Sequence, residues 1–107
     1  MLVTIGDYAF FNCASLTSVT IPDGVQSIGQ NAFQSCTSLS SVAMSEGVQT
    51  IGQYAFADCT ALTSFTVPDS VQSIGYNSFG GCSALEELTL PFVGETESSN
   101  TFFSYLF

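Results

Sequence analysis

The sequence predicts an α/β repeat solenoid, in which short parallel strands of successive units lie directly above one another. Two observations carry this prediction. Similar residues recur at a constant interval of 23 positions, and each interval holds one stretch of alternating apolar and polar residues that ends at a turn. A unit this short cannot enclose a core by itself, so stacked units must cover one another's apolar side chains.

The interval is clearest in the cysteines, which are spaced 23 residues apart along the chain. Five further sets of residues keep the same spacing. Together the six sets are Cys13, Cys36, Cys59 and Cys82; Leu16, Leu39, Leu62 and Leu85; Gly6, Gly29, Gly52 and Gly75; Phe10, Phe33, Phe56 and Phe79; Ile5, Ile28, Ile51 and Ile74; and Leu2, Val25, Val48 and Val71. We therefore expect a solenoid of about four units over residues 1–91, followed by an irregular aromatic C-terminal segment over residues 92–107.

The first element of a unit is a short strand with one buried and one exposed face. Leu16, Val19 and Ile21 are apolar and keep an L-x-x-L-x-L spacing. Ser18 and Thr20 alternate with the last two of them, and successive side chains of a strand point to opposite faces. The alternation predicts that the hydroxyl groups face solvent.

A turn, a second extended piece and a helical turn complete the unit. Pro-Asp-Gly at residues 22–24 stops the strand, because proline donates no hydrogen bond and Asp-Gly favours tight turns. Val25 and Ile28 form the second extended piece, which Gly29 ends. Asn31 to Cys36 is expected to be a single helical or 3₁₀ turn that directs its apolar side chains inward.

The pattern L-x-x-L-x-L-P…V-x-x-I-G-x-x-A-F-x-x-C, present over about residues 2–91, resembles the BspA-like (treponemal-type) leucine-rich repeat family of surface proteins. The resemblance implies a right-handed leucine-rich-repeat superhelix. Its parallel strands would lie on the concave side, with short strands and 3₁₀ turns on the convex side. It also implies adhesion or protein interaction outside the cell rather than catalysis. The chain departs from the pattern at Met44-Ser45, which replaces Ile-Pro, and at Ser78, which replaces alanine.

The charges exclude several classes of function. The chain has nine carboxylates, no Lys, Arg or His, and a net charge of −9. Nucleic-acid binding requires cations to displace counterions from phosphates, and the common hydrolases require an imidazole or amine base. A membrane-spanning helix requires about 20 consecutive apolar residues, whereas no apolar run here exceeds four. We expect a protein without catalytic activity, cofactor, nucleic-acid partner or membrane insertion.

The cysteine column allows three interpretations. Equivalent α-carbons about 5 Å apart permit disulfides, but repeated units point their β-carbons the same way, which keeps the β-carbons too far apart. A straight column also cannot converge on a tetrahedral zinc ion. Free, buried thiols are the favoured interpretation. The phenylalanine column is expected in the core, and Tyr8, Tyr54 and Tyr76 nearer the surface, where exposed aromatic residues can mark a partner site.

A second column, of carboxylates, lies at the turns and holds Asp23, Glu46 and Asp69. One interpretation is a weak calcium site, because hard cations favour carboxylate oxygens. The other is a solvated turn that recurs because the unit recurs. We favour the second interpretation.

The candidate interaction face is the outward side of the strands. Its residues carry small hydroxyl groups or a carboxylate and suit an extended protein or glycan ligand bound through many weak contacts. They are Ser18, Thr20, Ser41, Ser64, Thr66, Glu87 and Thr89. The chain starts within a unit and ends in apolar residues, so we expect a fragment of a larger cell-surface protein. A structural spacer that associates end to end through open solenoid ends remains the alternative.

Overall fold

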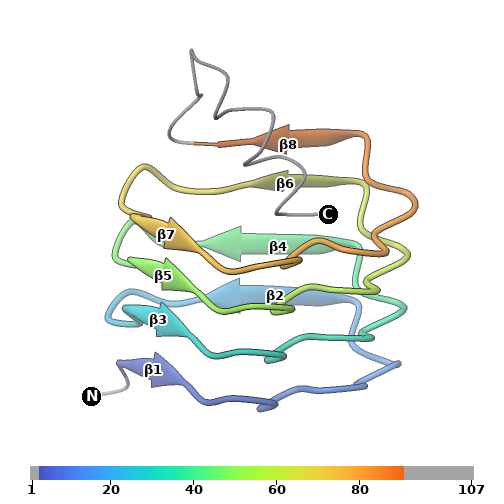
Figure 1. The fold of residues 1–107 in the computed structure, drawn as a ribbon, viewed down its shortest axis with the longest axis horizontal. Coiled ribbons are helices and arrows are strands. Elements are labelled where there is room, and N and C mark those ends of the chain that lie inside the picture. The colour runs from blue at the N-terminus through green and yellow to red at the C-terminus, as the bar shows by residue number, and fades with distance from the viewer. Residues whose placement is uncertain (1–2, 91–107) are drawn as a thin grey trace.

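The computed structural model describes residues 3–90 as a solenoid of four stacked coils (Figure 1). Each coil contains two short strands joined by turns. Coil 1 comprises residues 3–24 with β1 (Thr4–Ile5) and β2 (Ser18–Ile21); coil 2, residues 25–47 with β3 (Ser27–Ile28) and β4 (Ser41–Met44); coil 3, residues 48–70 with β5 (Thr50–Ile51) and β6 (Ser64–Thr66); and coil 4, residues 71–90 with β7 (Ser73–Ile74) and β8 (Glu87–Thr89). The expected C-terminal segment, residues 92–107, lies outside the described residues.

Strands of neighbouring coils pair in parallel with the register that the repeat predicts. The first strand of every coil joins one four-stranded sheet in the order β1-β3-β5-β7. Thr4 pairs with Ser27, Ser27 with Thr50, and Thr50 with Ser73, each one repeat interval later. The prediction of stacked coils with parallel strands is therefore confirmed, whereas the handedness and superhelical curvature stay predictions.

The second strands form two separate sheets instead of one. β2 pairs with β4 and β6 pairs with β8, but β4 and β6 belong to different sheets. The interruption coincides with a larger side chain, because Phe65 in β6 stands where β2 and β4 carry Val19 and Val42. Phe65 is buried and packs edge-on against Phe56 and Phe79, with ring centroids 4.8 and 4.9 Å apart respectively.

The prediction of a helical or 3₁₀ turn at Asn31 to Cys36 is wrong. This part of each coil consists of tight turns, and residues 3–90 contain no helix. In coil 1, the N–H of Ala9 bonds to the carbonyl of Gly6 and that of Cys13 to the carbonyl of Phe10. The third residues of these turns, Tyr8 and Asn12, have φ of 61° and 62°. Left-handed residues at this position are typical of type II turns and cannot continue a right-handed helix. The α/β assignment is corrected accordingly.

The same two left-handed positions recur in all four coils. Asparagine occupies three of these sites and glycine one, and both residue types tolerate this conformation. The full set is Tyr8, Asn31, Tyr54 and Asn77 at the first position and Asn12, Ser35, Asp58 and Gly81 at the second. Between coils, the N–H groups of Tyr8, Phe10 and Asn12 bond to carbonyls of coil 2. The turns therefore contribute an inter-coil hydrogen-bond ladder of their own.

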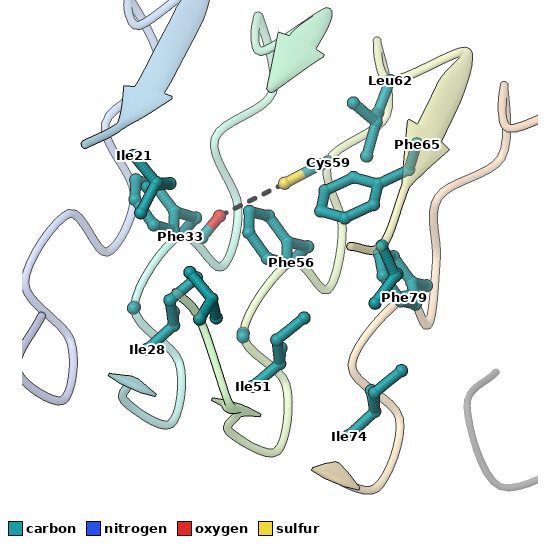
Figure 2. Packing of buried hydrophobic residues seen from close by; sticks show 14 of the residues in the cluster. Ile21, Ile28, Phe33, Ile51, Phe56, Cys59, Leu62, Phe65, Ile74 and Phe79 are labelled. Atoms are coloured by element: carbon teal, nitrogen blue, oxygen red, sulfur yellow. Dashed lines mark hydrogen bonds between the residues drawn. The ribbon is translucent and has the colours of Figure 1, made fainter. Parts of the chain in front are cut away.

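The core contains columns of identical side chains along the solenoid axis, as Figure 2 shows for phenylalanine and isoleucine. Phe33, Phe56 and Phe79 are fully buried. Phe33 stacks on Phe10 and on Phe56 with centroid distances of 5.1 and 5.2 Å and interplanar angles of 6° and 3°. The Phe56–Phe79 distance is 5.9 Å, in the step where Phe65 contacts both rings. The predicted core position of this column is confirmed for Phe33, Phe56 and Phe79, whereas Phe10 in coil 1 is 41% exposed.

The glycine column allows the coils to approach closely. A β-carbon at Gly52 would lie 2.5 Å from the backbone nitrogen of Gln30, and one at Gly75 would lie 2.2 Å from that of Gln53. Real β-carbons do not approach backbone atoms this closely. Gly6 differs, because a β-carbon there meets no atom within 4 Å. The requirement for glycine thus comes from the preceding coil.

Candidate interaction face

The candidate interaction face lies on the second strands of the four coils, where its side chains alternate with buried or half-buried ones. All seven predicted residues are exposed. Ser18 pairs with Ser41 across β2 and β4, and Thr66 pairs with Thr89 across β6 and β8. Although β4 and β6 are not paired, the four second strands follow one another along one side of the solenoid (Figure 1), so the seven residues share that side.

The face is nearly uncharged. Its one carboxylate, Glu87, pairs with Ser64 at one end of the face, and Ala43 replaces a hydroxyl residue opposite Thr20. Hydroxyl groups both donate and accept hydrogen bonds. The arrangement can bind polar ligands by hydrogen bonding, but it offers no ion pair to an anion.

A shallow groove on the four-stranded sheet was not predicted from the sequence. Its volume is about 540 Å³, and it runs along all four first strands. Hydroxyl residues form one wall, where Ser27 Oγ donates to Thr4 Oγ1 at 3.2 Å. Amides form the other, where Gln53 Nε2 donates to Gln30 Oε1 at 3.0 Å. The hydroxyl groups recurring every 23 residues at Thr4, Ser27, Thr50 and Ser73 were the signal that could have revealed it.

The four cysteines are free thiols arranged as a column. Three of the thiols donate a hydrogen bond to a backbone carbonyl of the preceding coil. These bonds run from Cys36 to Phe10 at 3.2 Å, from Cys59 to Phe33 at 3.2 Å and from Cys82 to Phe56 at 3.1 Å. Figure 2 shows the Cys59–Phe33 bond. The sequence predicted buried thiols but not these hydrogen bonds.

Burial suppresses the reactivity of the inner thiols. Burial raises the pKa of Cys59 to about 12 and, together with the nearby Cys82 and Cys36, disfavours the thiolate. Burial likewise raises the pKa of Cys82 to about 11 and raises that of Cys36. Because the thiolate is the nucleophile and the metal ligand, these raised pKa values disfavour attack or metal binding by the three thiols at neutral pH.

The carboxylate column and the tyrosines occupy the surface. Asp23, Glu46 and Asp69 are exposed at successive turns. Within the described residues, no three His, Cys, Asp or Glu side chains lie close enough together to hold a metal ion. The described residues therefore offer no three-ligand cluster that would support the calcium interpretation.

Tyr8 and Tyr54 occupy equivalent positions two coils apart, and Tyr76 lies in the adjacent column. Tyr8 is 53% and Tyr76 48% exposed, whereas Tyr54 is half-buried and contacts Tyr76 edge-on with centroids 5.8 Å apart. Tyr8 contacts Phe11 in the same manner at 5.5 Å. The structure thus places the exposed tyrosines at opposite ends of the solenoid rather than in one patch.

In residues 3–90, no helix is long and apolar enough to cross a membrane. A search of curated proteins finds no match for the chain. Solved structures do match. A leucine rich cell surface protein from Faecalibacterium prausnitzii is 38% identical with a TM-score of 0.78, and the alignment covers 80% of this chain and 22% of that one. A leucine-rich repeat protein from Bacteroides capillosus is 42% identical with a TM-score of 0.75, covering 81% and 62%.

A third match, the leucine-rich repeat protein of T. pallidum, is 28% identical with a TM-score of 0.60 and coverage of 83% and 52%. The chain thus spans less than two thirds of the length of each of these three proteins. The model of the BspA type leucine rich repeat region matches residues 3–106 in six copies. Both the repeated core and this match lead to one assignment: the chain belongs to the BspA-type leucine-rich repeat family.

Proposed function

We propose that the chain is a non-enzymatic interaction or adhesion module of a larger cell-surface protein, located outside the cell. The observation that carries the proposal is the candidate interaction face, whose seven side chains are exposed and supported by a column-packed core. A rigid array of this kind can contact an extended ligand at every coil. The name of the similar Faecalibacterium prausnitzii protein supports the surface location.

The chemistry of the face favours a neutral or basic ligand. The chain has no cationic side chain to pair with a polyanion, and its nine carboxylates have no basic side chain as a partner. The raised pKa values of the buried thiols and the absence of an imidazole or amine base in the sequence support a binding role over catalysis. Protein and neutral glycan ligands remain the two candidate classes.

Binding of the full chain to immobilised ligands tests the proposal. The ligand panel consists of purified extracellular-matrix proteins and neutral oligosaccharides. The face variant is Ser64→Lys on β6, and the matched control is Ser83→Lys, at a serine outside both the face and the groove; both serines are exposed. We expect Ser64→Lys to weaken binding at least tenfold and Ser83→Lys to leave it unchanged. Equal effects of the two variants would contradict the assigned face.

A structural spacer with no specific ligand is the second candidate. The exposed apolar edge of coil 1, where Phe10 is 41% exposed, favours it. A spacer predicts that no member of the panel binds. That result would reject the adhesion proposal.

A further inference from the structure

The groove on the four-stranded sheet has two polar walls that continue from coil to coil. The hydroxyl wall consists of the outward side chains of the first strands, since each is followed in its strand by a buried isoleucine. The amide wall lies three residues further along each coil and contains Asp7, Gln30 and Gln53. The described lining residues therefore include one carboxylate, and the sequence supplies no cationic side chain.

Glycine keeps the floor between the two walls free of side chains. Gly29, Gly52 and Gly75 line the groove, and Ile28 and Ile51, which precede two of them, are buried in the core. The close approach of the coils requires glycine at these positions. The volume of about 540 Å³ lies within the range of ligand sites, roughly 300–1,000 Å³. A flat ligand can therefore approach the backbone between two polar walls.

Hydrogen bonds hold the amide wall in place and leave it able to bind a ligand. Gln53 Nε2 donates to Gln30 Oε1 at 3.0 Å, and Asp7 Oδ1 accepts the backbone N–H of Gln30 at 3.0 Å. A carboxamide has two N–H donors and an oxygen with two lone pairs. The bond between the glutamines uses one donor and one lone pair of the pair. Since these side chains are already ordered, a ligand that binds them causes less loss of side-chain entropy.

The amide row continues into an aromatic residue in coil 4. Tyr76 follows Gln53 by one repeat interval and is 48% exposed. Its ring contacts Tyr54 edge-on, with centroids 5.8 Å apart. The carbon-bound hydrogens of a sugar ring form an apolar face that packs on aromatic rings, whereas the sugar hydroxyls require donors and acceptors. A row of amides that continues in an exposed tyrosine offers both.

We propose that this groove binds an extended, neutral, β-linked glycan chain that lies along the solenoid axis. Sugar hydroxyls both donate and accept hydrogen bonds, so they match both walls. Paired strands recur at roughly 4.8 Å, a spacing similar to the length of one sugar residue in an extended β-linked chain. Successive sugars can therefore meet equivalent groups of successive coils. The absence of cationic side chains favours a neutral glycan over an acidic one.

A peptide suits the groove less well than a glycan. Extended peptides bind sheets mainly by adding a strand to an open edge, where backbone groups are unpaired. β3 and β5 are paired on both sides, so the groove crosses strands whose backbone groups already bond to one another. A peptide would have to be held by side-chain contacts alone.

The groove and the candidate interaction face lie on opposite sides of the solenoid. Ile51 from the four-stranded sheet and Phe65 from a second-strand sheet belong to the same core, which they enter from opposite sides (Figure 2). The exposed neighbours of these residues, Thr50 and Thr66, therefore face away from each other. The inference is consequently independent of the proposed function, which uses the second strands.

Titration of the full chain with purified probes, followed by nuclear magnetic resonance, tests the proposal. Cellohexaose and xylohexaose are extended β-linked chains, and maltohexaose is an α-linked chain that coils. An uncharged peptide rich in serine and threonine is the fourth probe. We expect at least one of the extended sugars to bind and to shift the side-chain amide signals of Gln30 and Gln53. Maltohexaose and the peptide should bind more weakly.

The first variant removes an amide from the groove. Gln53→Met keeps the length of the side chain, and the matched control is Gln49→Met, at an exposed glutamine of the same coil outside the groove lining. We expect Gln53→Met to weaken sugar binding at least about threefold, the loss expected for one hydrogen bond. Gln49→Met should leave binding unchanged. Circular dichroism checks that both variants retain the fold.

The second variant removes a hydroxyl group and separates the groove from the candidate interaction face. Thr50→Val changes the groove, and Thr66→Val changes the face; both threonines are exposed strand residues of coil 3. We expect Thr50→Val to weaken sugar binding at least about threefold and Thr66→Val to leave it unchanged. Loss of binding in Thr66→Val alone would place the sugar on the face. That result would overturn this proposal and leave the proposed function standing.

Three further results would overturn the proposal. The first is that neither extended sugar binds. The second is that maltohexaose or the peptide binds as tightly as the extended sugars. The third is an equal effect of Gln53→Met and Gln49→Met on the affinity for the sugar.

Discussion

The thiol of Cys59 donates a hydrogen bond of 3.2 Å to the backbone carbonyl of Phe33, one coil earlier. The same carbonyl accepts the N–H of Cys36 in its own coil. One carbonyl thus closes a turn within coil 2 and also connects that coil to the next. The side chain that repeats every 23 residues therefore serves both core packing and inter-coil hydrogen bonding.

Replacing Cys59 with alanine should lower the free energy of unfolding by about 1–3 kcal/mol, because it removes a buried sulfur and its hydrogen bond. Cys13→Ala is the matched control, since Cys13 is half-buried in the first coil. Urea unfolding monitored by circular dichroism measures both variants. Equal losses would show that the inter-coil bond contributes nothing measurable.

Stability should decline in alkaline solution because of the buried thiols. The pKa of Cys59 is raised to about 12 and that of Cys82 to about 11, so the folded state keeps protons that the unfolded state releases. The stabilisation is complete below the ordinary thiol pKa of 9.0 and is lost as pH rises toward these folded values. Each thiol contributes a slope of about −1.4 kcal/mol per pH unit over its window.

Urea unfolding at a series of pH values from neutral to alkaline measures this decline. Cys59→Ala should show a shallower decline than the wild type, because one of the titrating thiols is absent. Parallel curves for the two proteins would contradict the assignment to Cys59.

Gly52→Ala should destabilise the solenoid by about 1–3 kcal/mol, because its β-carbon would overlap backbone atoms of coil 2. Gly6→Ala should change stability by less than about 0.5 kcal/mol, since no atom lies within 4 Å of its β-carbon. Thermal melts of dilute protein compare the two. A comparable loss in Gly6→Ala would mean that glycine is needed for local conformation rather than for close stacking.

Ser78→Ala should stabilise the protein by about 1 kcal/mol. Ser78 is 0% exposed, and its Oγ lacks a hydrogen-bond partner in the described part of the chain. The equivalent residues Ala32 and Ala55 are also fully buried, so the site accommodates alanine. Ser73→Ala at an exposed site of β7 serves as control. A melting temperature for Ser78→Ala at or below that of the wild type would contradict this expectation.

Periodicity alone predicted the stacking, because the recurrence of Cys, Phe and Ile at one interval requires their side chains to share columns. It failed at Asn31–Cys36, where a helical turn was expected. Asn31 and Asn77 are of a residue type that favours left-handed backbone. Tyr8 and Tyr54 occupy the same position in the other two coils and do not favour it, so the sequence pattern did not predict this conformation. In this conformation the N–H groups of Tyr8 and Tyr54 bond to carbonyls of the next coil, and no single unit reveals such bonds.

Features that join coils were the least predictable. The seven residues of the candidate interaction face were found from alternation within a strand. The groove on the four-stranded sheet was missed, because Gln30 and Gln53 form its wall only after stacking. The separation of β4 from β6 also was not predicted; it coincides with Phe65, whose packing against Phe56 and Phe79 arises only in the stacked coils.

Anomalous scattering from sulfur in crystals of this chain tests the stacked architecture most directly. The account predicts that the sulfurs of Cys13, Cys36, Cys59 and Cys82 form one nearly straight row, with successive atoms about 5 Å apart. Sulfur positions scattered through the molecule, or paired at the bond length of a disulfide, would contradict it.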